Sequence, residues 1–430
     1  MTIVETTVTL SISGKSRSLE ELEAQIGQVL QAAGRQLLAQ ACRQVELELL
    51  EAEEPAVRRS KRRGRHLLTR FGWMRLERWH TWQPQGGYSY PLDEALGLGR
   101  HQHASPWILQ QAVALATRLP YRQATYLLGT FVEDAIDHRT LYRWVQQTGA
   151  AIVLEEDELQ QAVFQDGVIP DRDPTEREII LAEVDGTFLR SQREDGDKFE
   201  VRLPSRTGVP PVLAARTVGV LTTGKRLASL TAKHRRYQLQ ERVRYGGVET
   251  AQDFGERLFL QAETHLGISQ ARQVLLVGDG ADWIEALAGH DRWRATYQLD
   301  RWHLTHAFHR AFPDHPQLVK KLKQALYRGQ GKKIIPAVRL AKINGVGDPE
   351  QVESLLGYLQ ANQAGFYGAR SLWPQLSPEG RLVCVEGSGA VEKHIDLTIC
   401  RRLKGQGMCW TRKGANRLVK LRIRELDRAA

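Results

Sequence analysis

The sequence predicts a mainly α N-terminal region with a helix-turn-helix, followed by an α/β domain that contains a helical insertion. Three observations predict this division. Up to about residue 167, apolar residues recur mostly at helical spacing. A polar segment with two prolines, VIPDRDPTER (168–177), then interrupts that pattern. Beyond it come short runs rich in Val, Ile and Leu, as in strands that are buried on both faces.

A long helix is predicted first. Ser18 and Glu21 have the S-x-x-E spacing of a capping box. An apolar stripe then runs from Leu19 to Leu37, and the helix is expected to reach about Glu53. The stripe packs on its own domain or pairs with a second copy of the chain. We therefore take residues 1–56 as a helical region that is a candidate for dimerisation.

Residues 57–104 are predicted to hold a basic run and a β-hairpin. The run RRSKRRGR (58–65) has six basic residues in eight. The segment HLLTRFGWMRLERWHTW after it alternates in polarity around Gly72, as a hairpin does.

Residues 105–167 are predicted to be helical. One helix lies in LPYRQATYLLG, and a second is expected to begin at Asp137 and to end at Gly149. Two short helices suit a DNA-reading helix-turn-helix, in which the second exposes Arg139 and Arg143. The alternative is an ordinary helical pair of an α domain.

The α/β domain is expected to occupy residues 177–310 and 381–430, with the helical insertion at 311–380. Its predicted strands are EIILAEVDG, ARTVGVLTTGK, QVLLVGDG and TYQLD, with a helix near 251–265.

Charge indicates a polyanionic partner. The chain has 60 basic and 50 acidic residues, a net charge of +10. The stretch from Arg401 to Arg424 contains nine basic residues and no acid. Binding of such segments to nucleic acid releases counterions from the phosphates. The residues expected to contact DNA are Arg58, Arg59, Arg62, Arg63, Arg139, Arg143, Arg401, Arg402, Lys404, Arg412 and Lys413.

Composition favours a cytoplasmic protein with no membrane partner. No apolar stretch approaches the ~20 residues that span a bilayer, and the N-terminus lacks the regions of a signal peptide. The four cysteines form no C-x-x-C pair. His101 and His103 are too few to indicate zinc, so no structural metal is assigned.

Two acids are predicted to end neighbouring strands. Asp185-Gly186 and Asp279-Gly280 each follow a buried apolar run, and ligands of α/β sheets gather at the carboxyl ends of strands. Either pair alone is compatible with a simple turn. Two adjacent carboxylates favour Mg²⁺ or Mn²⁺, and two such ions assist in-line attack on a phosphodiester. Candidates for a third acid are Glu386, Glu392 and Asp396.

The combination of EVDGTFLR, LLVGDGADWI, YQLDRWHL and GSGAVE…ICRRLKGQGMCWTRKGANRLVKLR resembles the DDE transposases of bacterial insertion sequences, in the mutator-like group. The resemblance implies an RNase H-like catalytic core split by a helical insertion. It places the catalytic and metal-binding acids on Asp185, Asp279 and Glu392, with Glu386 as the alternative third acid. Asp300 and His303 resemble an element proposed to support that active site.

The resemblance implies a DNA transposase with two Mg²⁺ or Mn²⁺ ions per active site. Such an enzyme binds double-stranded DNA at its element's terminal repeats, cuts it, and joins the ends to target DNA. It is expected to act as a homodimer or a larger assembly and to associate with the nucleoid when bound to DNA. The alternatives are a junction-resolving nuclease on the same fold and a non-catalytic DNA-binding protein derived from a transposon; a glycosidase is a more distant one.

Overall fold

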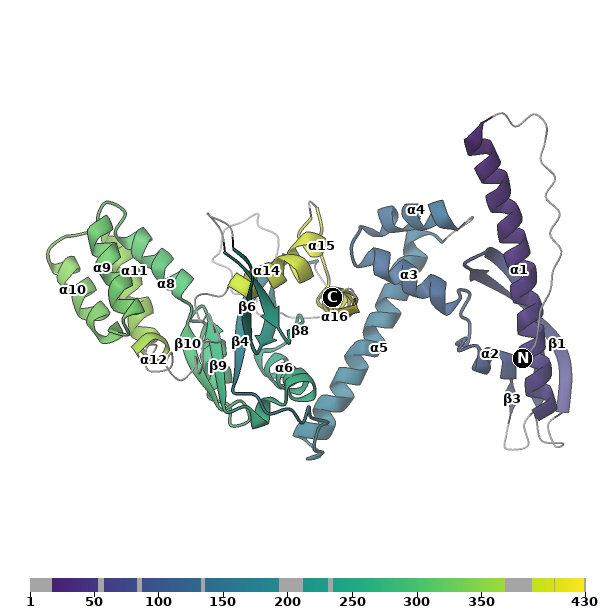
Figure 1. Cartoon of the computed structure of the whole chain (residues 1–430), viewed down its shortest axis with the longest axis horizontal. Helices are drawn as coiled ribbons and strands as arrows, with labels where there is room; N and C mark the ends of the chain where they lie inside the picture. The colour runs from purple at the N-terminus through teal and green to yellow at the C-terminus, as the bar shows by residue number, and fades with distance from the viewer. Residues whose placement is uncertain are drawn as a thin grey trace. The chain divides into compact units, whose positions relative to one another are not determined.

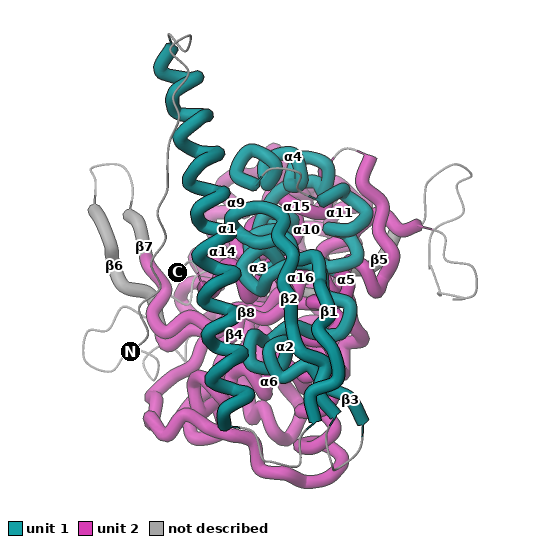
Figure 2. The backbone as a smooth tube through the Cα atoms, turned by 90° about the vertical axis from the view of Figure 1, so that its right-hand side faces the viewer, with its two compact units in different colours: residues 1–145 teal, residues 146–430 magenta. Residues whose placement is uncertain are grey.

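The computed structural model describes residues 18–52, 58–82, 87–132, 136–192, 212–230, 235–367, 389–405 and 407–428; at 212–217, 224–230, 235–237, 367 and 389 it describes the backbone alone. The chain divides into two compact units, Met1–Val145 and Gln146–Ala430 (Figure 2). Among the described residues, no helix combines the length and apolar character needed to cross a bilayer.

The first unit begins with the predicted long helix, α1 (Leu19–Ala52). The expected cap is present, because the Glu21 N–H donates to Ser18 Oγ at 3.2 Å. The hairpin of β1 (Arg58–Thr69) and β2 (Gly72–Trp82) follows, then β3 (Tyr88–Ser89) and α2 (Pro91–Ala95). The hairpin starts eight residues before the predicted segment, so the basic run itself is part of β1.

Three helices complete this region: α3 (Pro106–Ala116), α4 (Tyr121–Phe131) and α5 (His138–Phe164). Asp137 caps α5 as predicted, since its Oδ1 accepts the Arg139 N–H at 2.7 Å. The predicted end of this helix at Gly149 is wrong. A Cβ at position 149 would lie 2.9 Å from the Arg417 carbonyl oxygen, so this glycine permits close packing of helices rather than ending one.

The second unit contains a mixed five-stranded sheet. Its strands are β4 (Ile179–Arg190), β5 (Val212–Thr222), β8 (Val243–Gly246), β9 (Gln273–Gly278) and β10 (Ala295–Leu299). Their order is β10-β9-β4-β5-β8, with β4, β9 and β10 parallel and β5 antiparallel to both of its neighbours. A separate two-stranded sheet joins β6 (Gly224–Leu230) and β7 (Arg235–Gln240).

The prediction that Asp185-Gly186 ends a strand is wrong. The strand β4 continues to Arg190, and its register with β5 shifts between Asp185 and Thr187. Asp185 pairs with Val218 and Thr187 with Ala215, so β5 has one residue more than β4 at this bulge. Asp185 therefore lies at an irregularity inside a long strand.

Helices cover both faces of the sheet. Ile180, Ala182 and Val184 of β4 pack with apolar residues of α6 (Ala251–Leu266) and α7 (Asp282–Ala288) in one core. The alternate β4 residues face α14 (Gly389–Ile395). The helix α16 (Arg412–Arg428) contacts β8 (Figure 1).

The described residues between β10 and residue 367 are helical and have their own core. Their helices are α8 (Arg301–Ala311), α9 (Pro316–Tyr327), α10 (Ile334–Ile343), α11 (Pro349–Ala361) and α12 (Gln363–Tyr367), with a short turn η2 (Gly331–Lys333). Phe308, Phe312 and Leu359 are buried at the centre of this core. The cluster extends to Leu299 of β10, which joins the insertion to the sheet. Residues 368–388, including Glu386, lie outside the described residues.

Candidate active site

Three aspartates lie at one level of the parallel strands. The β4–β9 ladder pairs Glu183 with Val277, and the β9–β10 ladder pairs Gly278 with Leu299. Continuing these registers brings Asp185, Asp279 and Asp300 side by side. Neighbouring strands are about 4.8 Å apart, so the sheet alone gathers three carboxylates at one edge.

Asp185 is the electrostatic centre of this group. Burial raises the pKa of Asp185 above its ordinary value, and a hydrogen bond from the Gly186 N–H at 2.6 Å lowers it. The negative charges of Asp279 and Glu392 raise the same pKa, whereas His303 lowers it. The proposed acids thus interact with one another although 207 residues separate the first from the last.

The position of Glu392 depends on Glu183, a residue that sequence reasoning missed. Glu183 is 3% exposed, and its Oε2 accepts the N–H groups of Ala390 and Val391 at 3.0 and 3.1 Å. A buried carboxylate of β4 therefore holds the first turn of α14, where Glu392 lies exposed. The available signal was a charged residue inside an otherwise apolar strand.

Asp300 and His303 form the pair that the family resemblance suggested. Asp300 is fully buried and caps α8, accepting the His303 N–H at 3.1 Å. His303 Nδ1 lies 2.7 Å from Asp300 Oδ2. This hydrogen bond raises the pKa of His303, burial lowers it, and the charges of Asp185 and Asp279 raise it. The imidazole is thereby fixed beside the acids with its protonated form favoured.

A residue of the helical insertion holds the loop that carries Asp279. The Tyr358 hydroxyl of α11 donates to the Asp279 carbonyl oxygen at 2.6 Å. Gly280 has φ +99°, and a Cβ there would lie 2.8 Å from Asn362 Oδ1. Gly280 is therefore required both by its backbone conformation and by this contact, and Tyr358 is a second residue that the sequence did not reveal.

The carboxylates do not form a closed metal cage in this arrangement. Among the described residues, no three His, Cys, Asp or Glu side chains are placed to hold one metal ion together. One oxygen of Asp185 and one of Asp279 accept the backbone N–H groups of Gly186 and Ala281. The donor set nevertheless suits Mg²⁺ or Mn²⁺, because it consists of carboxylate oxygens whose charges repel one another.

Lys404, one of the predicted phosphate contacts, binds the strand that carries Asp185. It is exposed and donates to Thr187 Oγ1 at 2.5 Å, two residues beyond Asp185 on β4. Arg401 is exposed and forms an ion pair with Asp396 at 2.7 Å. Lys413 is exposed, and Arg412 donates to the Val248 carbonyl oxygen at 3.3 Å.

Arg402 differs from these cations because it is only 2% exposed. Its guanidinium lies over the Trp410 ring, 5.3 Å from the centroid. Trp410 is also buried and donates from Nε1 to the Leu403 carbonyl oxygen at 2.9 Å. In this arrangement Arg402 and Trp410 pack the C-terminal segment and do not present a surface to DNA.

The predicted cations of the first unit remain on its surface. Arg58, Arg59, Arg62 and Arg63 are exposed on β1. Arg62 pairs with the buried Glu46 at 3.0 Å and lies over the Trp79 ring. Arg139 and Arg143 are exposed in the first turns of α5. These positions leave guanidinium groups open to solvent on two elements.

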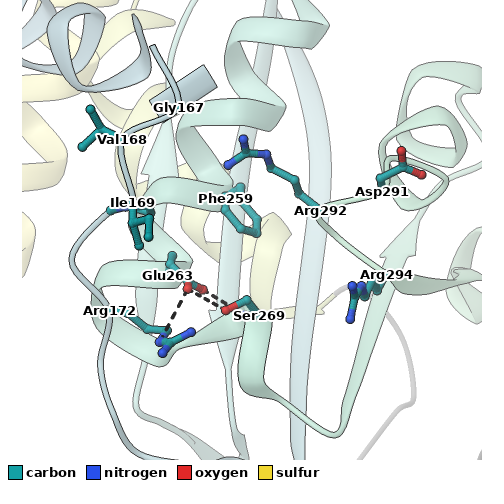
Figure 3. A pocket seen from close by; sticks show the side chains of 11 residues that line it. Gly167, Val168, Ile169, Arg172, Phe259, Glu263, Ser269, Asp291, Arg292 and Arg294 are labelled. Carbon is teal, nitrogen blue, oxygen red and sulfur yellow. Dashed lines mark hydrogen bonds and ion pairs between the residues drawn. The ribbon is translucent and has the colours of Figure 1, made fainter. Parts of the chain in front are cut away.

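A pocket lies at the other ends of the same strands (Figure 3). It has a volume of about 530 Å³, and its lining includes Arg172, Arg292 and Arg294. Glu263, one of its lining residues, accepts hydrogen bonds from Ser269 N at 2.9 Å and Ser269 Oγ at 2.6 Å. Because its residues precede β4, β9 and β10, this pocket is remote from the acids and is not part of the candidate site.

The described residues thus define a mixed α/β protein with a group of interacting carboxylates at one sheet edge. The chain belongs to the Uncharacterised protein family (UPF0236), which it matches over residues 14–429. The "UPF0236 protein in vanSb 3'region" of Streptococcus gallolyticus is 26% identical over 420 residues, which cover 94% of this chain and 82% of that protein.

Among solved structures, the chain is similar to the "Drosophila P element transposase strand transfer complex" with a TM-score of 0.22 and 13% identity. The match covers 78% of this chain and 81% of the other. A likeness this distant supports no conclusion about fold or function.

Proposed function

We propose that this protein is a DDE-type DNA transposase that binds the ends of an insertion sequence and catalyses metal-dependent strand cleavage and strand transfer. The observation that carries the proposal is geometric: the strand register brings Asp185 and Asp279 to one level, and the first turn of α14, which carries Glu392, is held against the same strand β4. These are the three positions that match the motif acids of the family that the sequence resembles.

The sheet supports an RNase H-like catalytic core. That fold has a five-stranded mixed sheet in which the second strand runs antiparallel to the others. The sheet of this protein also has five strands. Its second strand along the chain, β5, runs antiparallel to its neighbours β4 and β8, and β4, β9 and β10 are parallel. The helical insertion between β10 and α14 agrees with the split core that the resemblance implies.

Asp185, Asp279 and Glu392 would hold two Mg²⁺ or Mn²⁺ ions, which would supply activation of the attacking oxygen and stabilisation of the leaving oxygen. The carboxylates would have to close together on binding metal and DNA, because they are not gathered around one point now. Asp300 orients His303 beside them, and exposed Lys404 would hold a phosphate close to Asp185.

Recognition of DNA ends is assigned to the first unit and the start of α5. The pair α4 and α5 would serve as a helix-turn-helix with Arg139 and Arg143 toward DNA, and the β1 arginines would contact backbone phosphates. Leu19 and Ile26 of the α1 stripe are 72% and 41% exposed, which supports this stripe as the contact between two copies.

The test uses duplexes that carry the chromosomal DNA flanking the gene on each side, incubated with Mg²⁺ or Mn²⁺. Asp185→Asn, Asp279→Asn and Glu392→Gln should each abolish strand cleavage while binding of the duplex is retained. Asp282→Asn is the matched control, because Asp282 is an exposed acid three residues after Asp279.

Other results would redirect or end the proposal. Full cleavage by any of the three variants removes that acid from the site, and loss in Glu386→Gln with activity in Glu392→Gln transfers the third role. Cleavage of four-way junctions without cleavage of element ends would identify a resolvase. Binding without cleavage by the wild-type protein would indicate a non-catalytic protein.

A further inference from the structure

The solvent-facing side of α8 carries an aromatic and imidazole stripe that leads away from the acids. The helix begins at Arg301, after its cap Asp300, and Trp302, His306 and His309 follow at helical spacing on one face. Trp302 is 50% exposed although it is one of the largest apolar side chains. Its ring stacks on His306 with centroids 4.7 Å apart and meets the edge of His303 at 4.9 Å.

The stripe ends at a basic hollow between α8 and α9. The hollow has a volume of about 330 Å³ and is lined by His309, Pro316, Val319, Lys320, Lys323, Gln324 and Tyr327. None of these lining residues is acidic. Lys320 and Lys323 form no ion pair with any residue in the described part of the chain, so their charge is not neutralised within the protein.

We propose that the α8 face binds a single-stranded stretch of DNA next to the cleaved phosphodiester. One base stacks on Trp302, and the phosphates beyond it are held by Lys320 and Lys323. This inference rests on the proposed function for the position of the cleaved bond. The distance along α8 from Trp302 to His309 is about 10 Å, at ~1.5 Å per helical residue.

A single strand fits this surface better than a duplex does. The free side of an indole ring binds the face of a base, and the base faces inside a duplex are covered by their neighbours. His306 stacks on the Trp302 ring, and half of the Trp302 side chain is exposed to solvent. Charge complementarity in the hollow then favours the phosphates of the same strand.

The first measurement is fluorescence anisotropy in EDTA with labelled oligo(dT), compared with a duplex of equal length. Trp302→Ala should raise the Kd for oligo(dT) about tenfold, whereas Trp302→Phe retains most of the affinity. The double variant Lys320→Ala/Lys323→Ala should weaken binding of oligo(dT) to a similar extent. Lys321→Ala is the matched control, because Lys321 is exposed on α9 but does not line the hollow.

The second measurement locates the base. 5-Iodouracil is placed at successive positions on both sides of the cleaved bond, and the cross-linked peptide is identified after irradiation. A cross-link to Trp302 from one or two adjacent positions is expected. Absence of that cross-link, or an unchanged Kd for oligo(dT) in Trp302→Ala, overturns the inference. Cross-linking of an added peptide or partner protein at Trp302 in its place would identify a protein-binding face.

The two proposals fail in different ways. In one outcome, cleavage requires Asp185 but does not depend on Trp302, and no cross-link to Trp302 forms. This outcome leaves the transposase proposal intact and overturns the proposal that single-stranded DNA binds the α8 face. In the other outcome, the wild-type protein binds oligo(dT) through Trp302 but cleaves no DNA. This outcome supports single-strand binding on the α8 face and overturns the transposase proposal.

Discussion

Glu183 of β4 accepts a hydrogen bond from the Ala390 N–H at 3.0 Å, across 207 residues of sequence. The contact fastens the start of α14 to the centre of the sheet. It also explains how Glu392, on an exposed turn, comes within electrostatic range of Asp185.

Glu183→Leu should therefore release α14. Two N–H groups lose a charged acceptor, and the free energy of unfolding should fall by about 2 kcal/mol in a urea titration. Hydrogen exchange of the peptide covering 389–395 should accelerate at the same time. Glu183→Gln keeps an acceptor oxygen, so its stability and its exchange rate should lie between those of the wild-type protein and Glu183→Leu. Equal exchange rates in all three proteins would show that this contact does not hold the helix.

Asp185→Asn should stabilise the metal-free protein at neutral pH. Burial and neighbouring acids raise the pKa of Asp185, so the folded state binds its proton more tightly than the unfolded state does. Its contribution to stability is present at low pH and is lost as pH rises through that pKa. In EDTA at pH 7 the Tm of the variant should be higher by roughly 2 °C, with the difference vanishing below about pH 4.

Addition of a divalent metal ion should reverse the order of the Tm values of the wild-type protein and Asp185→Asn. On the proposed function, the folded acids would bind millimolar Mn²⁺, which should raise the Tm of the wild-type protein but not that of Asp185→Asn. An equal response of both proteins to Mn²⁺ would place the ion elsewhere.

Gly280→Ala should damage the loop that carries Asp279. The added methyl group meets Asn362 and Tyr358, and φ +99° is strained for alanine, so a loss of about 2–3 kcal/mol is expected. Gly345→Ala is the control, since Gly345 has φ +64° with nothing within 4 Å and tests strain alone. Equal losses in calorimetry would mean that the contact with Asn362 is unimportant.

Gly149→Ala should separate helix propensity from packing. Alanine is normally better than glycine inside a helix, but here its Cβ collides with the Arg417 backbone, so we expect a loss of about 1–3 kcal/mol. Gly129 of α4 has open space around it, and Gly129→Ala should gain about 0.5–1 kcal/mol. A gain at both positions would contradict the close approach of α5 and α16.

Lys420→Met tests a buried ionic cluster. Lys420 is 3% exposed, and its Nζ lies 2.8 Å from carboxylates of Glu156 and Glu249. Removing the cation leaves the buried Glu249 and the partly buried Glu156 with Arg257 as the one described cation of the cluster, and should cost about 3 kcal/mol in chemical denaturation. Lys413→Met, at an exposed position of the same helix, should change stability by less than about 0.5 kcal/mol.

Local signals predicted much of the fold. The caps at Ser18 and Asp137 depend on short-range hydrogen bonds, and the position of Asp279 just after β9 follows from one apolar run and one glycine. The first-turn position of Glu392 was also expected, from the glycines before it.

The errors arose where distant segments decide the structure. The end of α5 was misplaced because only α16 reveals why Gly149 is a glycine. The continuation of β4 past Asp185 depends on an extra residue in its partner strand. Glu183 was missed because its partner, the start of α14, lies far along the chain.

Between α14 and α15 (Arg401–Leu403), residues Asp396–Cys400 form a wider, π-helical turn. Such a turn inserts one residue relative to an α-helix, and each residue of an α-helix accounts for about 100° of rotation. The turn therefore sets the rotational phase between Glu392 and Lys404. A one-residue deletion there would point the lysine to another side of the helix while leaving its chemistry unchanged.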